Sequence, residues 1–372
     1  MFSVFDGHGG CYAADLLGKT LHGVLAHNAG KMLEEGYKVG KDWENQMING
    51  NMEHGLELGD DLRPALAAGQ NPQSFAEMLS MSFMAVDANL LKTTQSLTFD
   101  PQFSYNHLLP PNNPSLLALA NLFDMGSCAI TAVIDVENDK LFVANVGDTR
   151  AVAGCWDPAK SKWRCDILTE DATCENEKEV ERIRSEHPED ERFTAVFNQG
   201  FGDTNRVHGG LQISRAFGDD AYKLNHEEFK GDIHPVSGEE LKFVILATDG
   251  LWDRMTSEEA SYLLASHFTH EIQQDVSKVD VMAYCPHTLP AMDNEHPYPK
   301  EELNVHGKWV YEDANAATHL IRNAIGGEDR ELRRQLMSMK RPGARSVRDD
   351  TTAIVIWFDD PQNMVNKGGG AA

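Results

Sequence analysis

The chain has 372 residues, which is enough for one large domain or two ordinary ones. We predict a single large domain over residues 1–360. Its 33 Lys and Arg against 58 Asp and Glu give a formal net charge of -25. A chain of that sign repels nucleic-acid backbones and anionic membranes, so its charge favours a cationic partner or a bound metal. Most of these carboxylates solvate surface loops, and only their spacing can mark one as functional.

The six cysteines form no C-x-x-C pair and no dense framework, which is typical of a reducing compartment. The sequence has no apolar run of 18 residues, no secretory signal and no transit peptide, so we predict no transmembrane segment. It opens directly on a core-like strand without a frayed leader. We therefore expect that Met1 is not the true start of the protein.

The first ten residues, MFSVFDGHGG, combine a short apolar run with a glycine-rich turn. The apolar run predicts a buried strand that ends in Asp6, Gly7 and His8. Asp6 offers a hard oxygen ligand, the carbonyl of Gly7 can approach an ion, and His8 can move a proton near neutral pH. Because a strand ending in Asp-Gly is more often a plain turn, the prediction depends on similar carboxylates at other strand ends.

Two long helices are predicted in the first quarter of the chain. Apolar residues at helical spacing indicate one over residues 12–27. Ser74 and Glu77 form a capping-box pattern that opens the second, which we expect to end near Leu91. Residues 28–70 are polar and glycine-rich, which predicts a loop insertion, and residues 93–114 are also expected to form a loop.

From residue 127 onward the pattern becomes that of β-strands. Runs over 127–136, 140–146 and 150–155 predict an antiparallel meander whose second strand leads into Asp148. A continuous apolar strand over residues 241–247 leads into Asp249, and Asp349 precedes a last strand over 351–358. Three further carboxylates therefore lie at strand ends, as Asp6 does.

The remaining segments complete the predicted order. They are a short strand over 164–168, a charged, solvent-facing helix over 175–186, a helix capped by Thr256 and Glu259, an insertion near 270–310 without periodicity, an amphipathic helix over 313–325 and a flexible tail over 361–372. The four acidic turns indicate that the sheet gathers oxygen ligands at one end. Oxygen donors without cysteine pairs favour Mg²⁺ or Mn²⁺ over Zn²⁺.

Six motifs carry a family resemblance. DGHGG (6–10), GSCA (126–129), VGDTRAV (146–152), GGLQISRAFGD (209–219), ATDGLWD (247–253) and RDDTTAIV (348–355) resemble the ordered motif set of the metal-dependent type 2C serine/threonine phosphatases. Residues 168–188 and 311–327 resemble more closely the mitochondrial pyruvate dehydrogenase phosphatase branch. The resemblance spans residues 1 to about 358 and spares the loops at 28–70 and 270–305.

The resemblance implies an α+β fold in which an antiparallel β-sandwich is flanked by helices on both outer faces. It also implies a centre of two Mg²⁺ or Mn²⁺ ions, with a third, weaker ion. In this sequence the positions matching the family's metal ligands are Asp6 as the bridging carboxylate, the carbonyl of Gly7, Asp249 and Asp349, with Asp148 and Asp253 matching ligands of the weaker ion.

The reaction implied is hydrolysis of phosphoserine or phosphothreonine on a protein. Two cations would neutralise the phosphate dianion and acidify the attacking water. His8, beside Asp6, matches the family's general acid, which protonates the serine alkoxide as it leaves. The substrate implied is the E1 component of the pyruvate dehydrogenase complex, in the mitochondrial matrix, with the cytoplasm as the alternative location.

The chain departs from the family in one respect. Two strands that include a phosphate-binding arginine usually precede DGHGG, so we expect this chain to lack the first strands of the fold. The alternative function is a non-catalytic pseudophosphatase that binds a partner, although the intact Asp6, His8, Asp249 and Asp349 favour an enzyme. If the chain supplies its own phosphate-binding arginine, Arg150 and Arg348 lie nearest the acidic turns.

Overall fold

A computed structural model describes most of the predicted elements. The described residues are 1–32, 75–98, 122, 125–157, 162–198, 204–223, 232–237, 241–267, 274–284, 306–340, 344 and 347–358. Ser74, the tail at 361–372 and most of the predicted insertion at 28–70 lie outside them.

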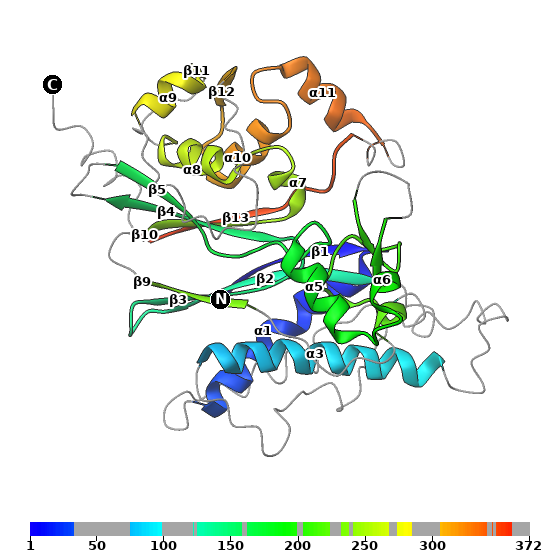
Figure 1. The fold of residues 1–372 in the computed structure, drawn as a ribbon. Helices are drawn as coiled ribbons and strands as arrows, with labels where there is room; N and C mark the ends of the chain where they lie inside the picture. Colours follow the sequence, from blue (N-terminus) through cyan, green and yellow to red (C-terminus); the bar gives the residue numbers. More distant parts are fainter. Residues whose placement is uncertain are drawn as a thin grey trace, which may run out of the picture.

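The architecture is a stack of four layers, with two antiparallel sheets in the middle and helices outside (Figure 1). The first sheet has the order β1 (Phe2–His8), β2 (Gly126–Asp135), β3 (Lys140–Val146) and β9 (Asp232–Ser237), with β8 (Phe217–Gly218) paired to β2. The second has the order β13 (Ala353–Trp357), β10 (Leu241–Ala247), β4 (Arg150–Asp157) and β5 (Lys162–Ile167). The predicted α+β sandwich is confirmed.

The helices form the two outer layers. Below the first sheet in Figure 1 lie α1 (Tyr12–Met32) and α3 (Phe75–Thr98). Above the second lie α7 (Asp249–Trp252), α8 (Ser257–Ala265), α9 (Lys278–Tyr284), α10 (Ala316–Ala324) and α11 (Arg330–Ser338), with the hairpin of β11 (Gln274–Ser277) and β12 (Lys308–Tyr311). Beside the sandwich, α5 (Glu177–Glu186), α6 (Arg192–Ala195), β6 (Val196–Phe197) and β7 (Arg206–Val207) make a small unit, and a short 3-10 helix, η2 (Asp220–Tyr222), follows β8.

Alternation along the strands explains why three apolar layers form. In β10, Val244 and Leu246 pack between the two sheets, whereas Phe243 and Ile245 pack against the outer helices. Successive side chains of a strand point to opposite faces, so a strand that is apolar throughout can be covered on both sides. From Phe243 to Ala247 the sequence of β10 is continuous in apolar residues because this part of the strand separates two cores.

The predictions from sequence differ from the structure mainly at helix ends and in elements of the second half of the chain that were not predicted. The second helix continues to Thr98 instead of ending near Leu91. The hydroxyls of Thr93 and Thr94 within it bond to carbonyls one turn earlier, so these polar side chains are accommodated in the helix. Part of the predicted insertion at 270–310 is ordered as β11, α9 and the start of β12. The strand β9 and the helix α11 were not predicted. Among the described residues, no helix is both long and apolar enough to cross a membrane.

Candidate active site

The ends of four strands meet at one rim because neighbouring strands are antiparallel. In the first sheet, His8 at the end of β1 faces Gly126 at the start of β2, and Val146 at the end of β3 faces Ala129. In the second sheet, Ala247 at the end of β10 faces the first residues of both β4 and β13. The turns after β1, β3 and β10 and the turn before β13 therefore lie together.

Cys128 of β2 lies between the first two carboxylates. Its backbone faces Asp6 across the β1–β2 pair, and its thiol donates to Oδ1 of Asp148 at 3.2 Å. Gly147 adopts φ of +100°, and a Cβ there would lie 2.2 Å from the Cys128 sulfur. A glycine is therefore needed for the turn to bring Asp148 over Cys128.

The other two acidic turns are fastened to each other. Thr248, which precedes Asp249, donates its backbone N–H to the carbonyl of Thr352 at 3.1 Å and accepts the N–H of Thr352 on its hydroxyl at 3.0 Å. A Cβ at Gly250 would lie 2.5 Å from the carbonyl oxygen of Asp350. The turns that carry Asp249 and Asp349 are thus in close contact, and the short helix α7 places Asp253 one turn after Asp249.

Electrostatics shows that these carboxylates share one field. Burial raises the pKa of Asp249 to about 8, and repulsion by Asp148, Asp6 and Asp253 adds to the effect. Burial also raises the pKa of Asp6 to about 6, a rise that its hydrogen bond with Asp249 limits. Burial raises the pKa of Asp148, an effect that the hydrogen bond from Cys128 limits and to which Asp349 adds. Burial also raises the pKa of Asp253, and repulsion by Asp148 and Asp349 adds to the effect.

The donor set fits a hard divalent cation. Oδ1 of Asp249 is buried and has no hydrogen-bond partner among the described residues, although a buried carboxylate oxygen normally has one. Several acidic groups repel one another there, which a cation would reverse. In the part of the chain that the structure describes, no three His, Cys, Asp or Glu side chains are already arranged around a common point as metal ligands. The case for a cation therefore rests on the orphaned oxygen and the mutual repulsion.

Both candidate arginines make hydrogen bonds to other residues of the chain. The guanidinium of Arg150 makes two bonds to Asp171, at 3.1 and 2.7 Å, and a third to the hydroxyl of Ser257 at 3.0 Å. Nε of Arg348 donates to the carbonyl of Leu336. Arg150 would have to abandon a buried ion pair to bind substrate, so it is not a phosphate ligand in this arrangement.

Comparison with known proteins places these observations in a family. A family model for protein phosphatase 2C matches residues 65–285. The chain belongs to the protein phosphatase 2C family. Two solved structures share the fold: a serine-threonine phosphatase 2C from Toxoplasma gondii, with a TM-score of 0.52 and 17% identity over 96% of this chain and 84% of that one, and a C. elegans sex determining protein, with a TM-score of 0.53 and 15% identity over 98% and 58%.

Curated relatives of this phosphatase 2C chain are longer than it is. It is 27% identical to the mitochondrial pyruvate dehydrogenase phosphatase 1 of Saccharomyces cerevisiae, over 96% of the chain and 62% of the relative. It is 30% identical to a protein phosphatase 2C homologue of Schizosaccharomyces pombe, over 75% of the chain and 64% of the relative. The resemblance to the pyruvate dehydrogenase phosphatases predicted from the motifs is confirmed.

One polar contact at the site of this phosphatase 2C chain was missed by the sequence analysis. Nε2 of His8 lies 2.8 Å from Oδ1 and 2.7 Å from Oδ2 of Asp219, which ends the GGLQISRAFGD motif. The two residues are far apart in sequence, and Asp219 does not follow a long strand. The signal that could have marked it was its place in the motif set.

Proposed function

We propose that this chain hydrolyses the phosphomonoester of phosphoserine or phosphothreonine on a protein, using Mg²⁺ or Mn²⁺. The observation that carries the proposal is the group of buried carboxylates whose pKa values are raised together at one rim of the sandwich, next to His8. The pKa of about 8 for Asp249 marks a group built to have its charge compensated by something that binds there.

The residues proposed to hold the cations are Asp6, the carbonyl of Gly7, Asp249 and Asp349, with Asp148 and Asp253 for a further, weaker ion. Bound divalent cations would neutralise the phosphate dianion and lower the pKa of a water positioned to attack phosphorus. The chain itself contributes the rim that brings the carboxylates together, and the burial that strengthens their field.

His8 is proposed as the general acid. When the phosphorus–oxygen bond breaks, the electron pair leaves with the serine oxygen, and this alkoxide is a poor leaving group unless it receives a proton. His8 lies two residues from Asp6 on the same strand end, and its ring is largely buried, with 17% of the side chain exposed. A proton can therefore be supplied beside the cluster that binds the phosphate.

The substrate and location follow the relatives. Curated relatives are named as phosphatases of pyruvate dehydrogenase and as mitochondrial, which supports a phosphorylated pyruvate dehydrogenase E1 component and the mitochondrial matrix. We further propose that residues 1–360 act as one catalytic domain.

The test is turnover of a phosphoserine peptide by the metal-free chain, before and after Mn²⁺ or Mg²⁺ is added. We expect hydrolysis only with the metal, and we expect Asp249→Asn to abolish it because the ligand loses its charge while its shape is kept. Asp190→Asn, an exposed aspartate away from the cluster, is the matched control and should not change the rate. Full turnover in excess chelator, or an unchanged rate for Asp249→Asn, contradicts the metal assignment. Metal binding without any turnover would instead support a non-catalytic binding protein.

A further inference from the structure

The contact between His8 and Asp219 is one of the most buried polar pairs at the rim. The Asp219 side chain is 5% exposed, and both of its oxygens lie within hydrogen-bond distance of Nε2. A carboxylate accepts hydrogen bonds, so this contact favours the His8 tautomer that carries its proton on Nε2. The other ring nitrogen, Nδ1, is buried and makes no hydrogen bond to any residue that the structure describes.

We propose that Asp219 is the positioning residue for His8 and that it fixes the tautomer of the ring with the proton on Nε2. This inference rests on the proposed general-acid role of His8. Asp219 does not touch the phosphate in this scheme. It holds the ring in one orientation and one tautomer, as the carboxylate of a catalytic triad does for its histidine.

The backbone at Asp219 shows that the contact is built at a cost. Asp219 has φ of +54°, in the left-handed region that residues with a Cβ rarely occupy, and it follows Gly218 with φ of +76°. Such conformations persist when their surroundings hold them in place. Here the N–H of Asp219 donates to the carbonyl of Met125 at 3.0 Å, which ties the turn to the residue before β2.

Helix α3 holds the same turn from the other side. Asp87, which is buried, accepts the N–H of Gly218 at 2.8 Å and the ammonium of Lys223 at 2.7 Å. Thr94, two turns further along α3, donates to Asp220 at 2.9 Å. The turn is thereby fixed on both flanks of Asp219, as expected of a support that must place a carboxylate within a fraction of an ångström.

Gly126 leaves room for the pair. A Cβ at this position would lie 2.3 Å from Nε2 of His8 and 2.4 Å from Oδ2 of Asp219. The strand that faces His8 therefore lacks a side chain where His8 and Asp219 meet. The turn at Asp219, helix α3 and Gly126 all support the contact between His8 and Asp219. This convergence favours a functional role for the contact.

The first experiment compares two substrates. A phosphoserine peptide needs a proton on its leaving group, whereas p-nitrophenyl phosphate has a phenolic leaving group that needs little. Asp219→Asn keeps a residue that tolerates the left-handed backbone and removes the carboxylate. We expect kcat for the peptide to fall by about ten- to a hundredfold, with KM, metal affinity and kcat for p-nitrophenyl phosphate nearly unchanged. A similar loss on both substrates, or no loss on the peptide, overturns the inference.

Asp139→Asn is the matched control. Asp139 also has a positive φ, of +50°, but it lies exposed in the turn between β2 and β3. The same chemical change there should leave both rates unchanged. If Asp139→Asn reproduced the selective loss on the peptide, the effect would come from the exchange itself and not from the contact with His8.

The second experiment needs no turnover. In metal-free protein labelled with ¹⁵N-histidine, at a pH well above the ordinary histidine pKa, nitrogen shifts distinguish the two neutral tautomers. We expect the His8 resonance, identified by its loss in His8→Gln, to show the proton on Nε2 in the wild type and a mixture in Asp219→Asn. A proton on Nδ1 in the wild type overturns the inference. An enzyme inactive on both substrates that still shows the Nε2 tautomer would refute the proposed function and leave the contact standing.

Discussion

At the scale of the single residue, the candidate site contains carboxyl groups that are buried in surroundings that disfavour their charged form. Oδ1 of Asp249 is buried without a hydrogen bond from the described part of the chain, and the Asp249 side chain also lies against the carboxyl group of Asp6. Burying such groups uncompensated costs free energy. We propose that the binding of a cation offsets this cost.

His8→Ala is expected to lower kcat for a phosphoserine peptide by about a hundredfold or more. Its effect on metal affinity should be small, because the histidine is not among the proposed ligands. The loss should shrink with p-nitrophenyl phosphate, whose leaving group needs little protonation. Steady-state rates at saturating Mn²⁺ on the two substrates test this, and equal losses would indicate a structural role for the ring.

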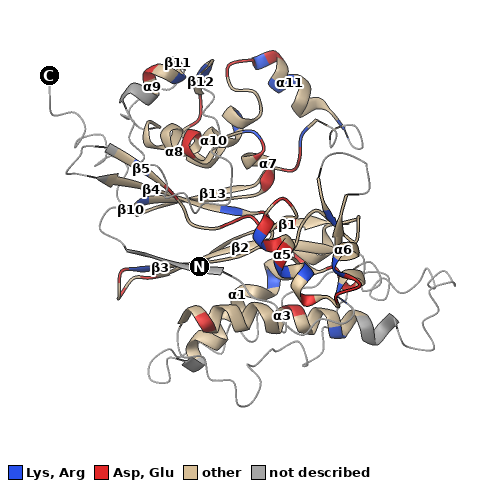
Figure 2. Cartoon of the chain, in the orientation of Figure 1, with Lys and Arg blue, Asp and Glu red and all other residues tan. Residues whose placement is uncertain are grey.

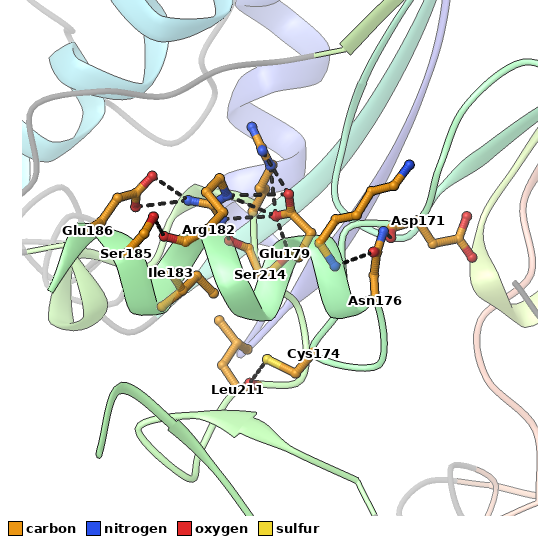
Figure 3. A network of polar contacts seen from close by, with 12 residues as sticks. Asp171, Cys174, Asn176, Glu179, Arg182, Ile183, Ser185, Glu186, Leu211 and Ser214 are labelled. Atoms are coloured by element: carbon orange, nitrogen blue, oxygen red, sulfur yellow. Dashed lines mark hydrogen bonds and ion pairs between the residues drawn. The ribbon is translucent and has the colours of Figure 1, made fainter. Parts of the chain in front are cut away.

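At the scale of the element, α5 shows how a charged helix is anchored. One face of this helix is exposed, as its charged sequence predicted, but Glu179, Val180 and Ile183 are buried against the rest of the molecule. Acidic and basic residues alternate along α5 in Figure 2. Figure 3 shows the polar contacts of the buried Glu179. Glu179 accepts from Arg215 at 2.7 and 2.8 Å, from Arg182 at 2.9 Å and from the hydroxyl of Ser214 at 2.7 Å. The network joins α5 to the segment that ends at Asp219.

Glu179→Gln is expected to destabilise the fold by roughly 3 kcal/mol at neutral pH. Burial alone would raise the pKa of Glu179, but the bonds from Arg215 and Arg182 prevail and lower it to about 2. A carboxyl whose pKa is lowered by folding stabilises the native state above its ordinary pKa of 4.5, and that stabilisation is lost as the pH falls towards 2. The difference between the two proteins should therefore shrink over that range.

Urea unfolding at a series of pH values measures this difference. Glu181→Gln is the control, because Glu181 is exposed on the same helix and should show little difference at any pH. A Glu179→Gln deficit that stays constant down to the acid limit would mean that packing, and not the ion pairs, accounts for the loss.

At the scale of the whole molecule, we propose that the acidic rim of a chain with a formal charge of -25 binds divalent cations in the native state. The ligands come together only when the chain is folded, so metal binding stabilises the native state by mass action. Asp249, with a pKa of about 8, is largely protonated at neutral pH in the metal-free protein and must release that proton to act as a ligand.

Mg²⁺ or Mn²⁺ at a hundred times its Kd is therefore expected to stabilise the fold by about 2.7 kcal/mol and to raise Tm by roughly 3.5 °C. Proton release on binding should appear in calorimetry as a dependence of the heat on the buffer's ionisation enthalpy. Sodium chloride at the same ionic strength is the control for general screening of the acidic surface. A Tm that rises equally with sodium, or equally in Asp249→Asn, contradicts a specific site.

The parts of this molecule that depend on local sequence pattern could be predicted from the sequence. The strands around Asp148 and Asp249 follow from apolar runs, and the capping box of Thr256 and Glu259 is present in the structure. The contact of Asp219 with His8 depends on a turn held by a helix from elsewhere in the chain, and no local pattern reports that. The burial of Glu179 was missed for the same reason, because its partners lie outside α5.

The position of β13 has a consequence for the order in which the molecule can be made. It covers one edge of β10, and the turn before it carries Asp349. While the chain is being synthesised, β10 and Asp249 emerge long before β13, so the apolar central strand has an exposed edge in the meantime. The last strand closes that edge and delivers Asp349 to the rim in one event. A nascent chain therefore gains its complete set of proposed metal ligands only when its second sheet is also complete.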